Sequence, residues 1–136
     1  MSSPALRTSP ADPFAAVYAR HGTNYQETNQ EDGYRKAAEF YTTAASLDPT
    51  SGPYHFQLAV ICDHLKDWDR AIAEYKAAKE LGEPAEKIDT ALSGAYLSQA
   101  RALKANNQLD QAKAVFDEAL KLNPNLQKYD REFNER

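Results

Sequence analysis

Three side chains near the middle of the sequence, His55, Asp63 and His64, are of types that bind metal ions. The two imidazoles are nine residues apart. On a helix this spacing is half a turn out of phase, so the two rings would point in opposite directions. A zinc site in a protein takes several ligands at close spacing, and no further ligand follows here at such a spacing. We therefore expect no metal and no other cofactor.

Motifs for catalysis give no positive indication of an enzyme. The sequence contains no GxSxG, no glycine-rich phosphate loop and no HExxH. His21 occupies a position typical of packing. Cys62 falls on the face of a helix that we expect to be buried, where thiols are normally inert. We therefore interpret the chain as non-catalytic, with an enzyme assembled from distant residues as a third alternative.

The composition restricts the class of protein. A chain of 136 residues has room for one domain, and its 16 Lys plus Arg and 20 Asp plus Glu give a net charge of -4 with the signs interleaved. Without a basic block, nucleic acid is not an expected partner. The single cysteine excludes an internal disulfide, the N-terminus lacks the apolar core of a secretory signal, and no apolar run is long enough for a membrane span. These features predict a cytoplasmic protein.

Helical periodicity accounts for most of the chain, and no alternating pattern predicts a strand. The Ser- and Pro-rich residues 1–12 predict a flexible leader, after which Asp12 and Pro13 form a typical helix start. The first helix should end before a polar turn at 28–33. Further helices are expected at about 34–47, 53–65, 68–81, 85–106 and 109–122, followed by a short amphipathic helix that carries Leu126, Tyr129 and Phe133.

The predicted helices contain an internal repeat. Five positions recur 34 residues further on, and again after another 41 residues: Tyr34, Ala37, Tyr41, Ala44 and Leu47; Trp68, Ala71, Tyr75, Ala78 and Leu81; Leu109, Ala112, Phe116, Ala119 and Leu122. The excess of seven residues is close to two helical turns, which keeps the apolar face in register. A period in this range indicates stacked helical units with an extended surface instead of a closed pocket.

The repeat resembles the tetratricopeptide repeat. The resemblance rests on a small residue early in the second helix, an aromatic four residues later, an alanine three beyond that, and a final Asp-Pro or Asn-Pro. It implies an all-α fold, a right-handed α-solenoid of three antiparallel helix pairs at about 14–51, 52–84 and 85–125, with a cap at 126–136, all in one domain at 13–136. Small residues should line the crossings within each pair: Gly22, Ala37, Ala59, Ala71, Ala100 and Ala112.

The resemblance also implies a concave groove that binds an extended peptide or a partner's helix. Its groove positions, carried over to this sequence, give the candidate partner-binding residues Phe56, Val60, Asp63, His64, Leu97, Arg101 and Lys104. Phe56, Val60 and Leu97 would form an apolar strip. Arg101 and Lys104 would form a basic spot suited to a carboxylate. The expected partner is therefore a protein or peptide with an apolar anchor beside an acidic group.

Other interpretations of these residues stay open. The leader, a neighbouring helix or a second copy of the chain could cover the apolar strip, and Arg101 and Lys104 could be an ordinary solvated face. Family members that hold the C-terminal carboxylate of heat-shock chaperones use Lys, Arg and Asn at positions that here hold Ala19, Thr23, Gln57, Gly94 and Ser98. We therefore expect a scaffold or adaptor for another partner. The alternatives are a structural or self-associating subunit, with a homo-oligomer possible, and an assembly chaperone.

Overall fold

The structure is a computed structural model and describes residues 12–134. The expected leader therefore lies outside the described residues, apart from Asp12. The helices are α2 (Pro13–Gln26), α3 (Glu31–Leu47), α4 (Gly52–His64), α5 (Trp68–Glu80), α6 (Ala85–Ala105), α7 (Leu109–Leu122), the 3-10 helix η1 (Pro124–Tyr129) and α8 (Asp130–Asn134). No strand occurs between residues 12 and 134. The predicted all-α class is confirmed.

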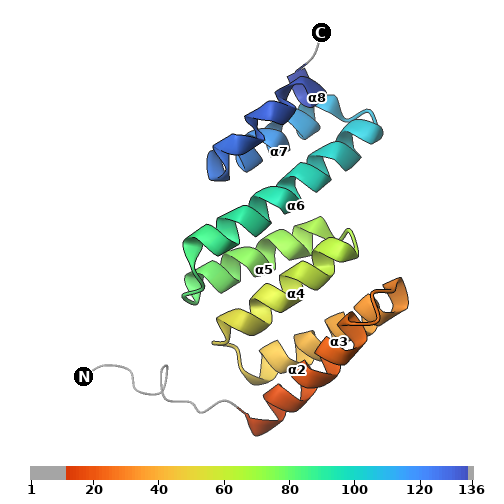
Figure 1. Cartoon of the computed structure of the whole chain (residues 1–136), viewed down its shortest axis with the longest axis vertical. Helices are drawn as coiled ribbons and strands as arrows, with labels where there is room; N and C mark the ends of the chain where they lie inside the picture. Colours follow the sequence, from red (N-terminus) through yellow and green to blue (C-terminus); the bar gives the residue numbers. More distant parts are fainter. Residues whose placement is uncertain (1–11, 135–136) are drawn as a thin grey trace, which may run out of the picture.

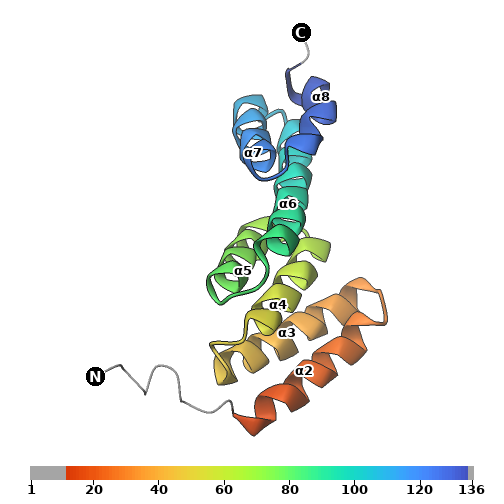
Figure 2. The same ribbon diagram turned by 60° about the vertical axis from the view of Figure 1, so that its left-hand side comes forward.

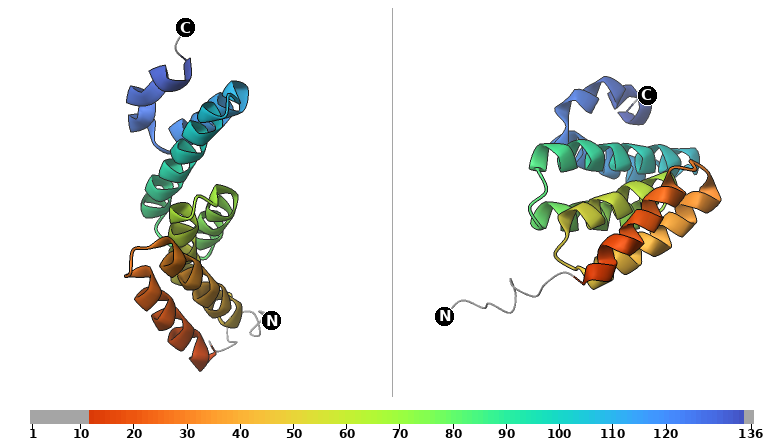
Figure 3. Two further views of the ribbon diagram at one scale, coloured as in Figure 1. Left: turned by 90° about the vertical axis from the view of Figure 1, so that its right-hand side faces the viewer. Right: turned by 60° about the horizontal axis from the view of Figure 1, so that its bottom comes forward.

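Successive helices form antiparallel pairs, α2 with α3, α4 with α5, and α6 with α7, and the pairs stack along the long axis of the molecule (Figure 1). α2 and α3 form one end of the stack, and α8 lies at the other. The stack bends into an arc in the side views (Figure 2, Figure 3). This is the α-solenoid that the resemblance implied. Each helix between residues 12 and 134 is too short or too polar to span a lipid bilayer.

Local sequence sets the ends of the helices. The Oδ1 atom of Asp12 accepts a hydrogen bond from the Phe14 amide at 2.8 Å, which confirms the predicted cap of α2. The turn inside each helix pair contains one residue with positive φ: Asn29 at 55°, Lys66 at 63° and Asn107 at 61°. The second and third turns also share a hydrogen bond 2.9 Å long, from the Asp67 amide to the Cys62 carbonyl and from the Gln108 amide to the Leu103 carbonyl, so these two turns have the same geometry.

The first turn is shorter than the sequence predicted. Residues 31–33, expected in the polar turn, form the first turn of α3, where Glu31 and Asp32 interact favourably with the helix dipole. Gly33 is buried there. A Cβ atom at this position would lie 1.9 Å from Thr28 Oγ1 and 2.6 Å from the Tyr25 carbonyl oxygen. Gly33 is therefore required by the close approach of α3 to the end of α2, and not by a turn.

The core follows the small residues at the helix crossings. Ala37, Ala59, Ala71 and Ala100 are 0% exposed and Ala112 is 1% exposed, while Gly22 is also buried. At Gly22 an added Cβ atom would lie only 2.6 Å from the Tyr41 ring. The predicted crossings are confirmed, since any larger side chain at these positions would separate the two helices of a pair.

The C-terminal cap differs in form from the single short helix that was expected. Pro124 and the Asn123 side chain, which accepts a hydrogen bond from the Asn125 amide at 3.1 Å, start the tight 3-10 helix η1 before the chain enters α8. Leu126 and Phe133 are buried, and the Phe133 ring stacks on Phe116 of α7 with centroids 4.4 Å apart. The cap therefore covers the side of the last helix pair that would otherwise be exposed to solvent.

Candidate partner-binding surface

One exposed side of α4 carries four of the predicted groove residues. Phe56, Val60 and His64 follow one another at intervals of one helical turn, and Asp63 lies beside His64. Phe56, Val60 and Asp63 are partly buried, whereas His64 is exposed. The helix lies in the middle of the stack (Figure 1). We refer to these four residues as the α4 surface.

The α4 surface contains a small hollow. Val60, Asp63 and His64 line a cavity of about 220 Å³. The His64 ring stacks on Tyr34 of α3, with centroids 4.5 Å apart and the planes at 10°. This contact links the first two helix pairs and holds the imidazole at the edge of the hollow.

Asp63 supplies a partly desolvated carboxylate at this hollow. Burial raises the pKa of Asp63, and Trp68 and His64 act in the opposite direction. The Trp68 indole N–H is buried and does not reach hydrogen-bond geometry with any described residue. A carboxylate has two acceptor oxygens, so Asp63 can accept a hydrogen bond from a donor that enters the hollow.

Phe56 lies at the other end of the α4 surface, between two helix pairs. Its ring meets Tyr75 of α5 edge-on with centroids 5.7 Å apart, and Lys87 Nζ of α6 lies 4.1 Å from the ring centroid. An ammonium group above an aromatic ring is a favourable contact. Phe56 therefore offers part of a ring bordered by a positive charge, not an isolated apolar anchor.

The three predicted residues of α6 lie in a different environment. Leu97 is only 7% exposed, so it belongs to the core and adds little accessible surface to the strip. Arg101 forms a bidentate pair with Glu132 of the cap, and its guanidinium lies 4.9 Å from the Tyr129 ring centroid. Lys104 Nζ lies 5.9 Å from the Phe133 ring centroid. The chain's own C-terminal segment already occupies the basic spot.

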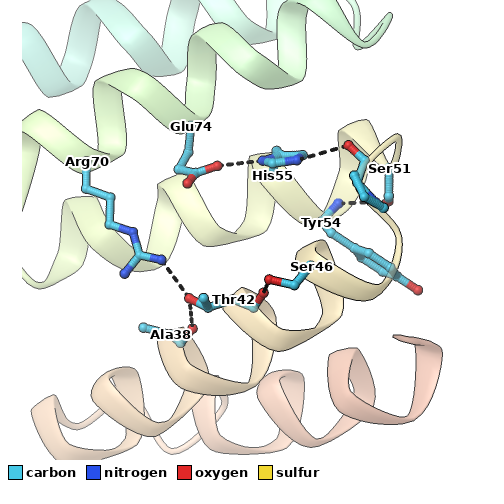
Figure 4. Close-up of polar contacts among 9 residues, drawn as sticks. Ala38, Thr42, Ser46, Ser51, Tyr54, His55, Arg70 and Glu74 are labelled. Atoms are coloured by element: carbon cyan, nitrogen blue, oxygen red, sulfur yellow. Dashed lines mark hydrogen bonds and ion pairs between the residues drawn. The ribbon is translucent and has the colours of Figure 1, made fainter. Parts of the chain in front are cut away.

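A polar cluster between the first two helix pairs was not anticipated from sequence (Figure 4). His55 Nδ1 lies 2.5 Å from Glu74 Oε1, and both side chains are 19% exposed. Arg70 Nη2 donates to Thr42 Oγ1 at 2.7 Å, and that hydroxyl donates to the Ala38 carbonyl at 2.6 Å. The cluster borders a cavity of about 300 Å³.

The aligned repeats contained a signal for this cluster. His55 stands where the other two copies have Tyr18 and Tyr96, and Glu74 stands where they have Phe40 and Val115. Two polar residues thus replace apolar ones at two positions of the same repeat. A joint replacement of this kind indicates a pair in contact.

Cys62 and His21 were also considered from the sequence, and the structure shows where each one lies. Cys62 is 1% exposed, and burial raises its pKa to about 11, so its thiol is protonated at neutral pH. His21, expected at a packing position, is exposed, with its ring 5.4 Å from that of Phe40. Along residues 12–134, no three His, Cys, Asp or Glu side chains gather as ligands for a metal ion.

The helix pairs stack on one another, and the first helix of the middle pair, α4, keeps one side accessible. This arrangement defines a helical-repeat protein of the α-solenoid class. Residues 93–126 match the sequence model of the tetratricopeptide repeat family. The matched residues overlap most of the predicted third repeat at 85–125 and run from before Tyr96 to beyond Pro124. The chain therefore contains a tetratricopeptide repeat, a fold of protein-interaction modules, as the resemblance indicated.

A solved structure that is similar to this chain is described as the first TPR of Spaghetti (RPAP3) bound to HSP90 peptide SRMEEVD. The two share 24% sequence identity, the match covers 82% of this chain and 80% of that one, and the TM-score is 0.47. Among curated proteins, no sequence matches this chain significantly.

Proposed function

We propose that this protein is a non-catalytic scaffold or adaptor that binds a protein partner across the α4 surface. The observation that carries the proposal is one side of α4, where Val60, Asp63 and His64 line a hollow and Phe56 lies further along the same side. The tetratricopeptide repeat at 93–126 supports it, because such repeats stack into surfaces that bind other proteins.

The proposed partner is an extended peptide or a helix with an apolar anchor beside an acidic group. The anchor would contact Phe56 and Val60, and the acidic group would approach Lys87 or the exposed side of Arg101 and Lys104. At Arg101 a partner carboxylate would compete with Glu132, since both are ligands for the same guanidinium. Binding at the basic spot should therefore be weaker than at an unoccupied arginine.

Selection from a random peptide library, followed by fluorescence anisotropy with the selected peptides, tests this function. We expect enrichment of peptides with an aliphatic or aromatic residue near Asp or Glu. Val60→Glu should weaken their binding about tenfold or more, which corresponds to about 1.4 kcal/mol, because it places a charge in the apolar contact. The matched control is Lys113→Glu at an exposed position on α7.

Two results would contradict the proposal. The first is a selection that yields no binding peptide. The second is a set of peptides that bind the Val60→Glu variant and the wild type equally well, which would place their site elsewhere on the molecule. Circular dichroism of each variant should show unchanged helix content, so that lost binding is not lost folding.

A further inference from the structure

One face of α2 exposes a stripe of aromatic rings at the end of the stack. Phe14, Tyr18, His21 and Tyr25 follow one another at spacings of four, three and four residues, which places them on one side of the helix. Phe14 is 64%, Tyr18 37% and Tyr25 38% exposed. Between residues 12 and 134, five large hydrophobic side chains are exposed, and these are three of them. Such a concentration on one helix indicates an interaction surface, since single exposed residues are normally scattered.

α3 completes this surface. The Phe40 ring stacks on Tyr25 with centroids 5.6 Å apart and planes at 10°, and lies 6.2 Å from the Tyr18 ring. Together with Lys36, Glu39 and Thr43, the three rings line a hollow of about 210 Å³. We refer to the residues around this hollow as the N-terminal aromatic face. Its stacked rings are rigid, so they would lose little conformational entropy on binding.

The second helix pair uses the equivalent face to stack on the first. Its residues at the positions of Tyr18, His21 and Tyr25 are His55, Leu58 and Cys62. Leu58 and Cys62 are only 1% exposed. Arg70, at the position of Lys36, donates a hydrogen bond back to Thr42 of α3. The N-terminal aromatic face is thus a repeat-stacking surface, and no described helix covers it (Figure 1, Figure 3).

A second copy cannot cover this face by continuing the stack head to tail. The matching surface at the other end is the outer side of α7. The cap already covers this side, with Phe133 stacked on Phe116. The arrangement left for two copies is head to head, in which the same face of each copy meets the other around a two-fold axis. Such a contact requires a surface that is complementary to itself.

The charges on this face meet that requirement. Lys36 and Glu39 lie one turn apart on α3, both are exposed, and both line the hollow. Neither forms an ion pair with another described residue. When two α3 helices run antiparallel around a two-fold axis between these positions, Lys36 of each copy faces Glu39 of the other. The two new ion pairs would lie next to the two-fold axis, and the aromatic rings of both copies would flank them.

We propose that this protein forms a symmetric dimer through the N-terminal aromatic face, with a second copy of the chain as the occupant. The proposal does not depend on the α4 surface, because the two surfaces lie on different helix pairs. It assigns a location to the self-association that the sequence left open as an alternative.

Sedimentation equilibrium of the full chain over a series of concentrations tests the dimer. The wild type should change from monomer to dimer as concentration rises. Lys36→Glu and Glu39→Lys should each raise the dimer dissociation constant about tenfold or more, because each variant brings like charges together. The double variant Lys36→Glu/Glu39→Lys should restore dimerisation, since both ion pairs form again with exchanged signs. Lys113→Glu on α7 is the control and should dimerise as the wild type does.

Several outcomes would overturn the proposal. If the wild type stays monomeric at all concentrations, the N-terminal aromatic face does not form a dimer, and a helix of a different protein would be its partner. A dimer that is insensitive to both single charge reversals forms through another surface. Failure of the double variant to recover would show that Lys36 and Glu39 do not face each other. These substitutions are at exposed positions, so circular dichroism should confirm that all variants fold.

Discussion

Arg101 donates two hydrogen bonds to the carboxylate of Glu132, one from Nε and one from Nη2, each 2.9 Å long. The hydrogen bonds to Glu132 raise the pKa of Arg101, and the same bonds lower the pKa of Glu132. A basic spot on α6 thus holds an acidic group of its own chain beside the aromatic rings of the cap. The chemistry that was predicted for an external partner is present within the molecule.

Glu132→Gln should loosen the cap with only a small loss of stability. Both side chains are more than one third exposed, so we expect a cost below about 1 kcal/mol in urea unfolding. Because the folded pKa of Glu132 is below its ordinary value, its contribution is present at neutral pH and is lost as the pH falls through the folded pKa. The variant should therefore differ from the wild type at pH 7 and converge with it in acid. Glu86→Gln on α6 serves as the control, and a constant difference across the pH range would contradict this account.

Gly22→Ala should destabilise the first helix pair by about 1–3 kcal/mol, because its Cβ atom would lie 2.6 Å from the buried Tyr41 ring. The ring has little freedom to move, since its hydroxyl lies 2.6 Å from Thr23 Oγ1. Gly94→Ala on α6 is the matched control. Its Cβ atom would meet nothing within 4 Å, so we expect a gain of up to about 1 kcal/mol from helix propensity. Thermal unfolding followed by circular dichroism compares the two, and equal midpoints would disprove the close approach.

The stability of the Asp63→Asn variant relative to the wild type should increase as the pH rises. Burial raises the folded pKa of Asp63, so the folded state holds this proton more tightly than the unfolded state. Its contribution to stability is therefore greatest in acid and is lost as the pH rises from the unfolded pKa through the folded pKa. The amide carries no charge and avoids this loss. Urea unfolding of both proteins between acid and neutral pH measures the difference, and a wild type that gains on the variant with rising pH would refute the prediction.

His55→Phe and Glu74→Val should each cost about 1–3 kcal/mol, because each leaves a partly buried polar partner without its hydrogen bond. The double variant should recover much of the loss. It replaces the pair with apolar residues of the kind found at Tyr18 and Phe40 in the first repeat, whose rings lie 6.2 Å apart. A double-mutant cycle in urea measures this coupling. Strict additivity of the two losses would show that the pair does not act as a unit.

The amino-acid sequence by itself determined the architecture of this protein. Small residues recur at Ala37, Ala71 and Ala112, and a close crossing of two helices admits only small side chains, so the recurrence indicates the helix pairs. Helix ends follow from the chemistry of adjacent residues, as the hydrogen bond from the Phe14 amide to Asp12 shows. Such features depend on near neighbours in the chain, which a sequence displays directly.

Tertiary structure alone decided which side chains stay accessible. Leu97 belongs to the predicted strip but lies in the core, and Arg101 pairs with Glu132, which is 31 residues away. Tyr18 and Tyr25 fit a packing pattern in the sequence and yet are exposed at the end of the stack. Periodicity shows that a face is apolar, but burial depends on whether a distant segment covers that face. The binding surfaces are therefore a product of the whole fold.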